Sequence, residues 1–282
     1  MLTHVQATTI LLLVNMLKDY KNKKTLLILG LAFVAFLVWW FSFQTKLDED
    51  SLSIKIFNSV YGLFALVGGI IGLVVSRKWG GSKSVLGKAL ILFSLGLFAQ
   101  EFGQIVYAIY YYVLKVEVPY PSLGDLGYFG SIPLYIYGAV LLARASGASF
   151  SMKSIINKVQ AIIVPILLLG GSYYIFLRGY EFDWSNPLTV FLDFGYPFGQ
   201  AVYLAIALLA FLFSRKLLGG IIRPGILMVL FALFVQYLSD FTFLYQTSHE
   251  TWKAGGTNDL MYLFSYFVMA VALLKFSSLY SK

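Results

Sequence analysis

Long apolar stretches alternate with short clusters of charged residues along the chain. Eight of these stretches hold the roughly 20 mostly apolar residues that a helix needs to cross the hydrocarbon layer of a membrane. They cover approximately residues 25–43, 57–75, 89–113, 126–143, 159–177, 188–213, 224–246 and 260–278. The pattern therefore predicts an all-α membrane protein with eight transmembrane helices.

A further apolar run near the N-terminus, Val5 to Leu17, is too short to cross a membrane, and four of the next seven residues are lysines. A cleaved signal peptide is disfavoured, because its positive charge precedes the apolar run, whereas here the charge follows it. We expect residues 1–20 to form a cytoplasmic segment that lies on the membrane surface as an interfacial helix.

The composition excludes a water-soluble globule, since 59% of the residues are hydrophobic and only 12% are charged. That charged fraction is about half of what a soluble chain carries, which leaves too little polar surface to cover an apolar core. The chain has no cysteine, which excludes disulfides, iron-sulfur clusters and thiolate zinc sites. Its two histidines, His4 and His249, lie outside the apolar spans. We therefore expect neither a resident cofactor nor a metal.

Sequence motifs for enzymatic chemistry are missing as well. The chain contains no Walker A loop, dinucleotide-binding fingerprint, His-Glu-x-x-His motif or kinase signature. Its basic residues lie on short loops between the spans and not on a folded basic surface, so a nucleic-acid partner is not expected. The sequence favours a protein without enzymatic activity, surrounded by membrane lipid.

Lysines and arginines are distributed unevenly between the two ends of the predicted spans. Sixteen of the 21 lie at one end, and the other five are Lys46, Lys55, Lys115, Arg178 and Lys253. Short cytoplasmic loops retain positive charge during membrane insertion, so the end with sixteen is predicted to be cytoplasmic. Both termini would then be cytoplasmic.

Four features recur in the same order at intervals of 134 to 138 positions, which indicates an internal duplication. The pairs are Asn22-Lys23 and Asn157-Lys158, Ser76-Arg77-Lys78 and Ser214-Arg215-Lys216, residues 97–100 and 233–236, and Gly124-Asp125-Leu126 and Asn258-Asp259-Leu260. Because each unit has an even number of helices, both copies would insert in the same orientation. We predict a parallel 4+4 internal repeat, with residues 21–148 as the first four-helix unit and 149–282 as the second. Such halves pack around polar residues that face a shared cavity.

Polar side chains lie inside the third and seventh spans. Glu101 and Gln104 share one face of the third helix, and Gln236 and Asp240 share one face of the seventh. Ionisable groups at this depth are costly and face the bundle interior or water. A ligand-binding role is one interpretation, and hydrogen bonds that tie the helices together are the other.

Three further acids lie toward the opposite end from the basic cluster. Asp125 follows Ser122 at the spacing of a capping box, and Asp259 stands near the start of a helix, where the dipole favours a negative charge. Asp193 would lie about two turns inside a helix that starts at Asn186-Pro187, which makes it a candidate for lining a cavity. Tyrosines are frequent around these acids; they suit a membrane interface, although acids and aromatic faces together also suit a cation.

One stretch, residues 120–143, reads YPSLGDLGYFGSIPLYIYGAVLLA. It resembles a stretch in the multi-helix membrane input domains of prokaryotic signalling proteins, in which a Pro-Ser-x-x-Asp turn opens a helix with tyrosines and a proline. The likeness is carried by Pro121, Ser122, Asp125, Tyr128 and Pro133. It implies a sensor in a prokaryotic cell membrane. Those proteins often continue into a histidine kinase or diguanylate cyclase, whereas no output domain follows here. The chain would then be either a stand-alone version that signals through a membrane or cytoplasmic protein partner, or the membrane part of a longer chain.

Three functional hypotheses remain open from the sequence. The first is a sensor or receptor-like module that binds a small or lipophilic ligand, or a cation, in an outward-facing cavity between the two repeats. The second is a transporter or channel in which Glu101 and Asp240 move protons or cations, and the third is a structural subunit of a membrane complex. The candidate ligand-binding residues are Glu101, Gln104, Asp125, Asp193, Gln236, Asp240 and Asp259.

Overall fold

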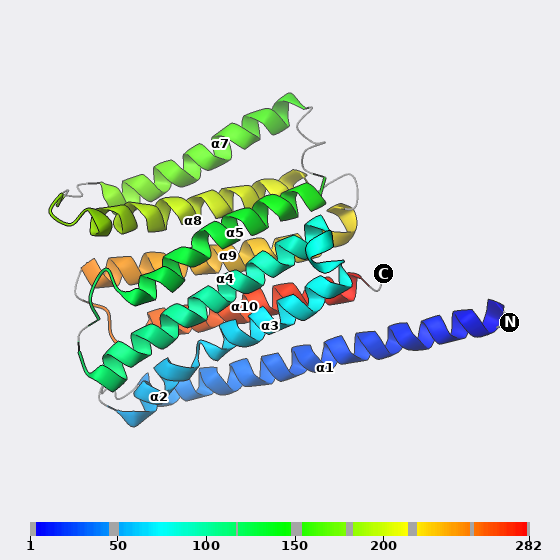
Figure 1. Cartoon of the computed structure of the whole chain (residues 1–282), viewed down its shortest axis with the longest axis horizontal. Coiled ribbons are helices and arrows are strands. Elements are labelled where there is room, and N and C mark those ends of the chain that lie inside the picture. The colour runs from blue at the N-terminus through cyan, green and yellow to red at the C-terminus, as the bar shows by residue number, and fades with distance from the viewer. Residues whose placement is uncertain are drawn as a thin grey trace.

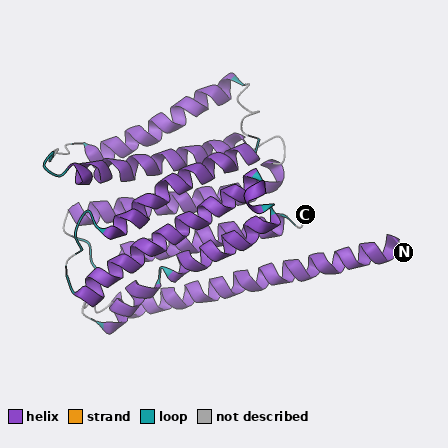
Figure 2. Ribbon diagram, in the orientation of Figure 1, coloured by secondary structure: helices purple, strands orange, loops and turns teal. Residues whose placement is uncertain are grey.

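The computed structural model describes residues 4–44, 51–116, 118–147, 154–178, 183–213, 219–248 and 251–280. Within these ranges the secondary structure consists of helices and short turns without a strand, as Figure 2 shows. The prediction of an all-α protein is confirmed for this part of the chain.

The α-helices of the described ranges form a bundle of long, roughly aligned rods (Figure 1). They are α1 (His4–Gln44), α2 (Leu52–Val60), α3 (Leu63–Lys78), α4 (Val85–Ala108), α5 (Leu123–Ala145), α7 (Ile155–Ser172), α8 (Pro187–Phe213), α9 (Gly219–Ser248) and α10 (Thr257–Leu279). Helices α4 and α7 continue into π-helical turns at Ile109–Leu114 and Tyr173–Leu177, and a 3-10 turn, Gly81–Lys83, precedes α4.

Eight segments among the described residues are long and apolar enough to cross a membrane, which identifies a multi-pass membrane protein. They are Asn22–Gln44, Leu52–Lys78, Val85–Leu114, Leu123–Ala145, Ile155–Ile175, Pro187–Phe213, Ile222–Gln246 and Thr257–Leu279. Each matches one stretch predicted from the sequence, so the number and positions of the spans are confirmed. The second span differs from the others because it is built from two helices, α2 and α3, with a break at Tyr61 and Gly62.

Residues 4–21 continue the helix of the first span without interruption. Figure 1 shows the N-terminal part of α1 projecting beyond the ends of the other helices. The placement of this segment on the membrane surface stays a prediction. The expected boundary between the two units, at residues 148 and 149, lies outside the described residues.

Neighbouring helices pack in a pattern that brings the two ends of the sequence together. Helix α4 packs against α5 and α3, and α10 packs against α9 and α3; α8 packs against α5, α7 and α9. At Gly127 of α5 an added Cβ would lie 2.4 Å from the carbonyl oxygen of Ala99 on α4, so glycine is required for this close approach. Helix α7 lies at the edge of the bundle beside α8 (Figure 1).

The first helix is fastened to α10 at both of its membrane ends. The indole N–H of Trp40 donates to the carbonyl of Gly255 at 3.0 Å, just before α10 begins. At the other end, Nζ of Lys78 donates to Oγ of Ser277 at 2.5 Å, and this hydroxyl donates to Oδ1 of Asn22 at 2.8 Å. These contacts join the N-terminal and C-terminal spans.

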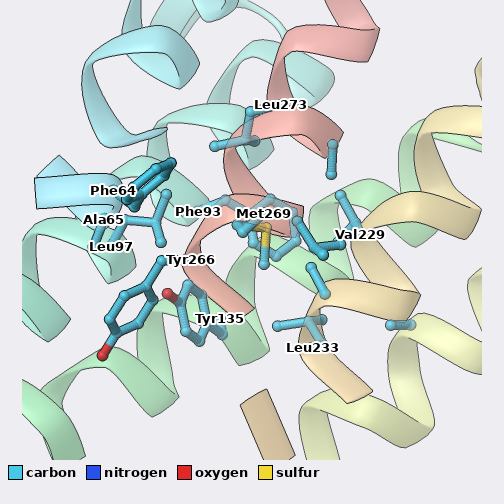
Figure 3. Close-up of a cluster of buried hydrophobic side chains, with 14 of the residues drawn as sticks. Phe64, Ala65, Phe93, Leu97, Tyr135, Val229, Leu233, Tyr266, Met269 and Leu273 are labelled. Carbon is cyan, nitrogen blue, oxygen red and sulfur yellow. The ribbon is translucent and has the colours of Figure 1, made fainter. Parts of the chain in front are cut away.

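A continuous apolar core runs through the bundle and is drawn in Figure 3. The side chains labelled there come from five helices, α3, α4, α5, α9 and α10, and are Phe64, Ala65, Phe93, Leu97, Tyr135, Val229, Leu233, Tyr266, Met269 and Leu273. Tyr135 and Tyr266 lie together at one side of this cluster (Figure 3). Both side chains are buried, so their hydroxyl groups bring polar atoms to the edge of the apolar core.

Candidate functional site

The break in the second span is closed by a glutamine of α4. Nε2 of Gln104 donates to the carbonyl oxygen of Asn58 at 3.0 Å. In an unbroken α-helix this carbonyl would accept from the N–H of Gly62, four residues later. Oε1 of Gln104 accepts from the hydroxyls of Tyr61 and Tyr128, both at 3.0 Å. The amide of Gln104 therefore holds α2, α4 and α5 together at the break.

Glu101 lies one turn before Gln104 on α4 and meets the same break. Its side chain is only 7% exposed, and its Oε2 is buried with no hydrogen-bond partner among the described residues. A Cβ added to Gly62 would lie 2.2 Å from this oxygen, so the carboxylate occupies space that only glycine leaves open. A buried ionised carboxylate without a partner is costly, and such groups mark sites that receive a proton, a cation or a ligand.

Asp240 on α9 has the opposite environment. Its Oδ2 accepts from Nε2 of Gln200 at 2.6 Å and from Nε2 of Gln236 at 3.0 Å. Its Oδ1 accepts from the hydroxyl of Tyr262 at 2.6 Å. Three donors on α8, α9 and α10 thus satisfy this carboxylate. This favours interhelical hydrogen bonding as the role of Asp240 over ligand binding or ion movement.

A chain of hydrogen bonds and stacked rings connects these two clusters. The hydroxyl of Tyr266 donates to Oε1 of Gln100 at 3.1 Å, and Nε2 of Gln100 donates to Oγ of Ser131 at 2.8 Å. The ring of Tyr266 stacks on Tyr61 at 6.4 Å between centroids and on Tyr262 at 6.2 Å. Tyr266 therefore lies between the break in the second span and the Asp240 cluster.

Asp125 acts as the sequence predicts, at the start of α5. The backbone N–H of Ser122 donates to Oδ2 of Asp125 at 2.7 Å, and the reciprocal bond of the capping box is also present. The hydroxyl of Tyr196 on α8 donates to Oδ1 of Asp125 at 2.6 Å. This acid is a helix cap with a contact to a neighbouring helix, and it is half-buried.

Asp259 and Asp193 occupy different surroundings. Asp259 is buried in the first turn of α10, where its Oδ2 accepts from the backbone N–H of Gly255 at 2.7 Å, and the side chains of Asn58 and Tyr61 face it. Helix α8 begins at Pro187, as predicted, and Asp193 accepts from the hydroxyl of Tyr120 at 2.7 Å in an exposed contact. Asp259 thus belongs to the cluster at the break, whereas Asp193 lies toward the surface.

The structure separates the seven candidate residues into groups. Glu101, Gln104 and Asp259 lie around the break, Gln236 and Asp240 form the second cluster, and Asp125 and Asp193 each contact a tyrosine. Sequence reasoning missed Asn58, Tyr61, Gly62 and Gln200. An amide inside an apolar span was an available signal for Asn58 and Gln200. The contact of a glycine with a carboxylate 39 positions away left no local signal.

Other polar atoms near these clusters also lack partners. Oδ1 of Asn58, Oδ1 of Asn258 and Nε1 of Trp252 are buried without a hydrogen-bond partner among the described residues. No group of three His, Cys, Asp or Glu side chains in the described ranges is arranged to hold a metal ion. No protein-family model matches the chain, and neither a curated protein nor a solved structure matches it.

Proposed function

We propose that this chain is a non-enzymatic membrane sensor or receptor-like module that binds a small ligand between two four-helix units and acts through a protein partner. The observation that carries the proposal is Glu101, a buried carboxylate in a membrane span whose Oε2 has no partner among the described residues. A neutral side chain could serve a purely structural role at this position without the free-energy cost of burying an ionisable group in the membrane.

The proposed parallel 4+4 repeat is supported by contacts that recur at the repeat interval. In the first unit Gln100 bonds Ser131 and Tyr128 bonds Gln104, and in the second unit Gln236 bonds Ser265 and Tyr262 bonds Asp240. The corresponding residues lie 134 or 136 positions apart. The contacts between the units are also equivalent. The second span of each unit packs on the fourth span of the other, since α3 packs on α10 and α8 packs on α5.

A difference between the two units supports a ligand role for Glu101. At the interval of 136 positions its counterpart is Tyr237, whose hydroxyl lies 2.9 Å from Oγ of Ser172. The second unit therefore has a neutral, hydrogen-bonded side chain where the first has an unpartnered acid. The scaffold does not need a carboxylate at this position, so Glu101 is more readily explained by binding than by folding.

A structural role is the second candidate, and it is favoured by the three donors around Asp240. That arrangement is expected in a rigid subunit whose polar residues serve helix packing. The same donors weigh against proton or cation movement through Asp240. Transport through Glu101 alone remains an outcome that the experiments below identify.

We also propose the orientation. The end of the bundle that holds Trp79 carries most of the basic residues and would be cytoplasmic, together with both termini. The end that holds Pro121 and Trp252 would face outward. The ligand would then bind Glu101 from the outer side of the membrane. Binding would displace one four-helix unit relative to the other, and a protein partner on the cytoplasmic side would sense this movement. We further propose that the protein is located in a prokaryotic cell membrane.

The test is ligand-dependent thermal stabilisation of the purified protein in mild detergent. A panel of amines, cations, lipids and metabolites is compared on the wild type and on Glu101→Gln, with Asp183→Asn, in the exposed turn before α8, as a matched carboxylate control. We expect at least one compound to stabilise the wild type and the control, and not Glu101→Gln. No shift across the panel, or a shift that Glu101→Gln retains, would contradict the proposal.

Two further measurements separate the alternatives. Ion or proton flux in proteoliposomes that disappears in Glu101→Gln would identify a transporter. Co-purification with fixed partners, without any ligand response, would identify a structural subunit. A stable monomer with a ligand response and no flux supports the sensor.

A further inference from the structure

The break between α2 and α3 lies deep in its membrane span. Tyr61 is the tenth residue of the span Leu52–Lys78. At 1.5 Å per residue this corresponds to a depth of about 15 Å, which is close to half of a hydrocarbon layer about 30 Å thick. Irregular backbone at such depth is tolerated only where its polar groups are buried in protein or line a cavity. Broken helices in membrane proteins place carbonyl oxygens where they coordinate small cations.

Resting on the proposed function, we propose that the ligand of Glu101 is a monovalent metal cation, Na⁺ or K⁺, held at this break by Oε2 of Glu101 and Oδ1 of Asn58. Both oxygens are buried, and neither has a hydrogen-bond partner among the described residues. Glu101 meets the break at Gly62, and Asn58, whose backbone carbonyl accepts from Gln104 there, faces Asp259 of the second unit. Asn58 is 5% exposed and stands one turn before Gly62, the residue that Glu101 contacts. Two unpartnered acceptors call for a cation, because an anion would meet only further negative charge.

The orientation of Asn58 supports this assignment. Its side chain faces the carboxylate of Asp259, which accepts hydrogen bonds and therefore attracts the amide nitrogen. The amide oxygen is then the atom left without a partner. The carbonyl of Asn58 is bonded by Gln104, so its backbone is fixed at the break as well.

Of the two acids at the break, Asp259 accepts a hydrogen bond from the backbone N–H of Gly255, so only Glu101 has an unpartnered carboxylate oxygen, and this indicates a single positive charge. No group of three His, Cys, Asp or Glu side chains is arranged for a metal in the described ranges, whereas calcium and transition metals are held by several such ligands. Glu101 contributes one unpartnered carboxylate, and one monovalent cation would neutralise it. Between residues 89 and 114 the third span has no lysine or arginine to do so from its own helix.

The space at the break favours a small ligand. A single added Cβ on Gly62 would already lie 2.2 Å from Oε2 of Glu101 and 3.0 Å from Cγ of Gln104. A bare ion fits such packing better than an organic ammonium. Because the counterpart of Glu101 in the second unit is Tyr237, we expect one site in each chain.

The experiment measures cation binding to the full chain in detergent. Sodium or potassium chloride replaces N-methyl-D-glucamine chloride at constant ionic strength, while the melting temperature is followed and ²²Na⁺ or ⁸⁶Rb⁺ binding is measured by equilibrium dialysis. We expect a saturable rise in melting temperature with Na⁺ or K⁺ and one bound ion per chain. Binding should fall at least about tenfold in Glu101→Gln, which loses the charged ligand.

Controls keep this test decisive. Asp183→Asn removes an exposed carboxylate in the turn before α8 and should retain full cation binding. Gly62→Ala keeps the charge but displaces the carboxylate, and it should also weaken binding. Size-exclusion chromatography establishes that each variant is folded. If Glu101→Gln fails this check, Gly62→Ala carries the comparison.

The outcomes separate this inference from the function on which it rests. A response to Na⁺ alone or K⁺ alone supports the inference and identifies the ion. If an organic compound stabilises the wild type but not Glu101→Gln, and neither ion does, the cation assignment is overturned while the sensor proposal stands. Cation binding that is undiminished in both site variants overturns the site. Absence of every ligand response overturns both proposals.

Discussion

Tyr266 on α10 donates its hydroxyl hydrogen to Oε1 of Gln100 on α4 over 3.1 Å, joining residues 166 positions apart. Both side chains are buried. The amide of Gln100 also donates to Ser131 on α5 at 2.8 Å, so one glutamine connects three helices. The bond belongs to the path between the break in the second span and the Asp240 cluster.

Removing that hydroxyl should loosen the contact between α4 and α10. We expect Tyr266→Phe to lose about 1 kcal/mol of stability, the usual scale for an interhelical hydrogen bond within a membrane. Tyr137→Phe is the matched control, because Tyr137 is 51% exposed. Thermal denaturation in detergent measures both. Equal stability of the two variants would show that the bond contributes nothing measurable.

The two acids inside the spans should respond oppositely to neutralisation. Without added metal cations, Glu101→Gln should raise the melting temperature, because it removes a buried charge that has no partner among the described residues. Asp240→Asn should lower stability by about 1–3 kcal/mol, since one of its three donors loses its acceptor. The measurement is denaturation in N-methyl-D-glucamine buffer. A loss in Glu101→Gln as large as in Asp240→Asn would place Glu101 among the structural residues.

Gly62→Ala should disturb Glu101 directly. The new Cβ would lie 2.2 Å from Oε2, so the carboxylate or the break must move. We expect a loss of stability that is partly relieved in the double variant with Glu101→Ala, with a coupling energy of about 0.5–3 kcal/mol in a double-mutant cycle. Gly170→Ala is the control, because an added Cβ there meets nothing within 4 Å. Strict additivity would mean that the two residues do not interact.

The orientation can be tested by labelling, because the chain has no cysteine of its own. Single cysteines are introduced by Ser185→Cys, in the turn before α8, and by Lys83→Cys, in the 3-10 turn before α4. Figure 1 shows the first turns of α8 and α4 at opposite ends of the bundle. In intact cells we expect a membrane-impermeant maleimide to modify the Ser185→Cys variant and not the Lys83→Cys variant until the cells are opened. The reverse pattern would invert the proposed topology.

The sequence predicts the spans well because a run of apolar residues of membrane thickness has few alternatives to a helix. It also predicts the capping box of Asp125, since Ser122 and Asp125 are close in sequence and determine that geometry locally. The break at Gly62 was not predicted, because the second span contains no proline. It becomes visible only when α4 brings Glu101 and Gln104 against it.

The role of Asp240 could not be predicted from the sequence either. Its position inside an apolar span suggested function as much as structure. The distinction depends on Gln200 and Tyr262, which lie 40 and 22 positions away and reach it only in the folded bundle. Whether a buried acid is satisfied is a property of tertiary packing, so periodicity and composition do not reveal it.

The most direct test of the central claim, that Glu101 is a ligand-binding carboxylate at the break in the second span, is a high-resolution electron cryomicroscopy map of the full chain in sodium or potassium buffer. We predict non-protein density against Oε2 of Glu101 beside Gly62, and its loss in a map of Glu101→Gln. A carboxylate that faces lipid, or that is closed off by protein hydrogen bonds with no added density, would contradict the account.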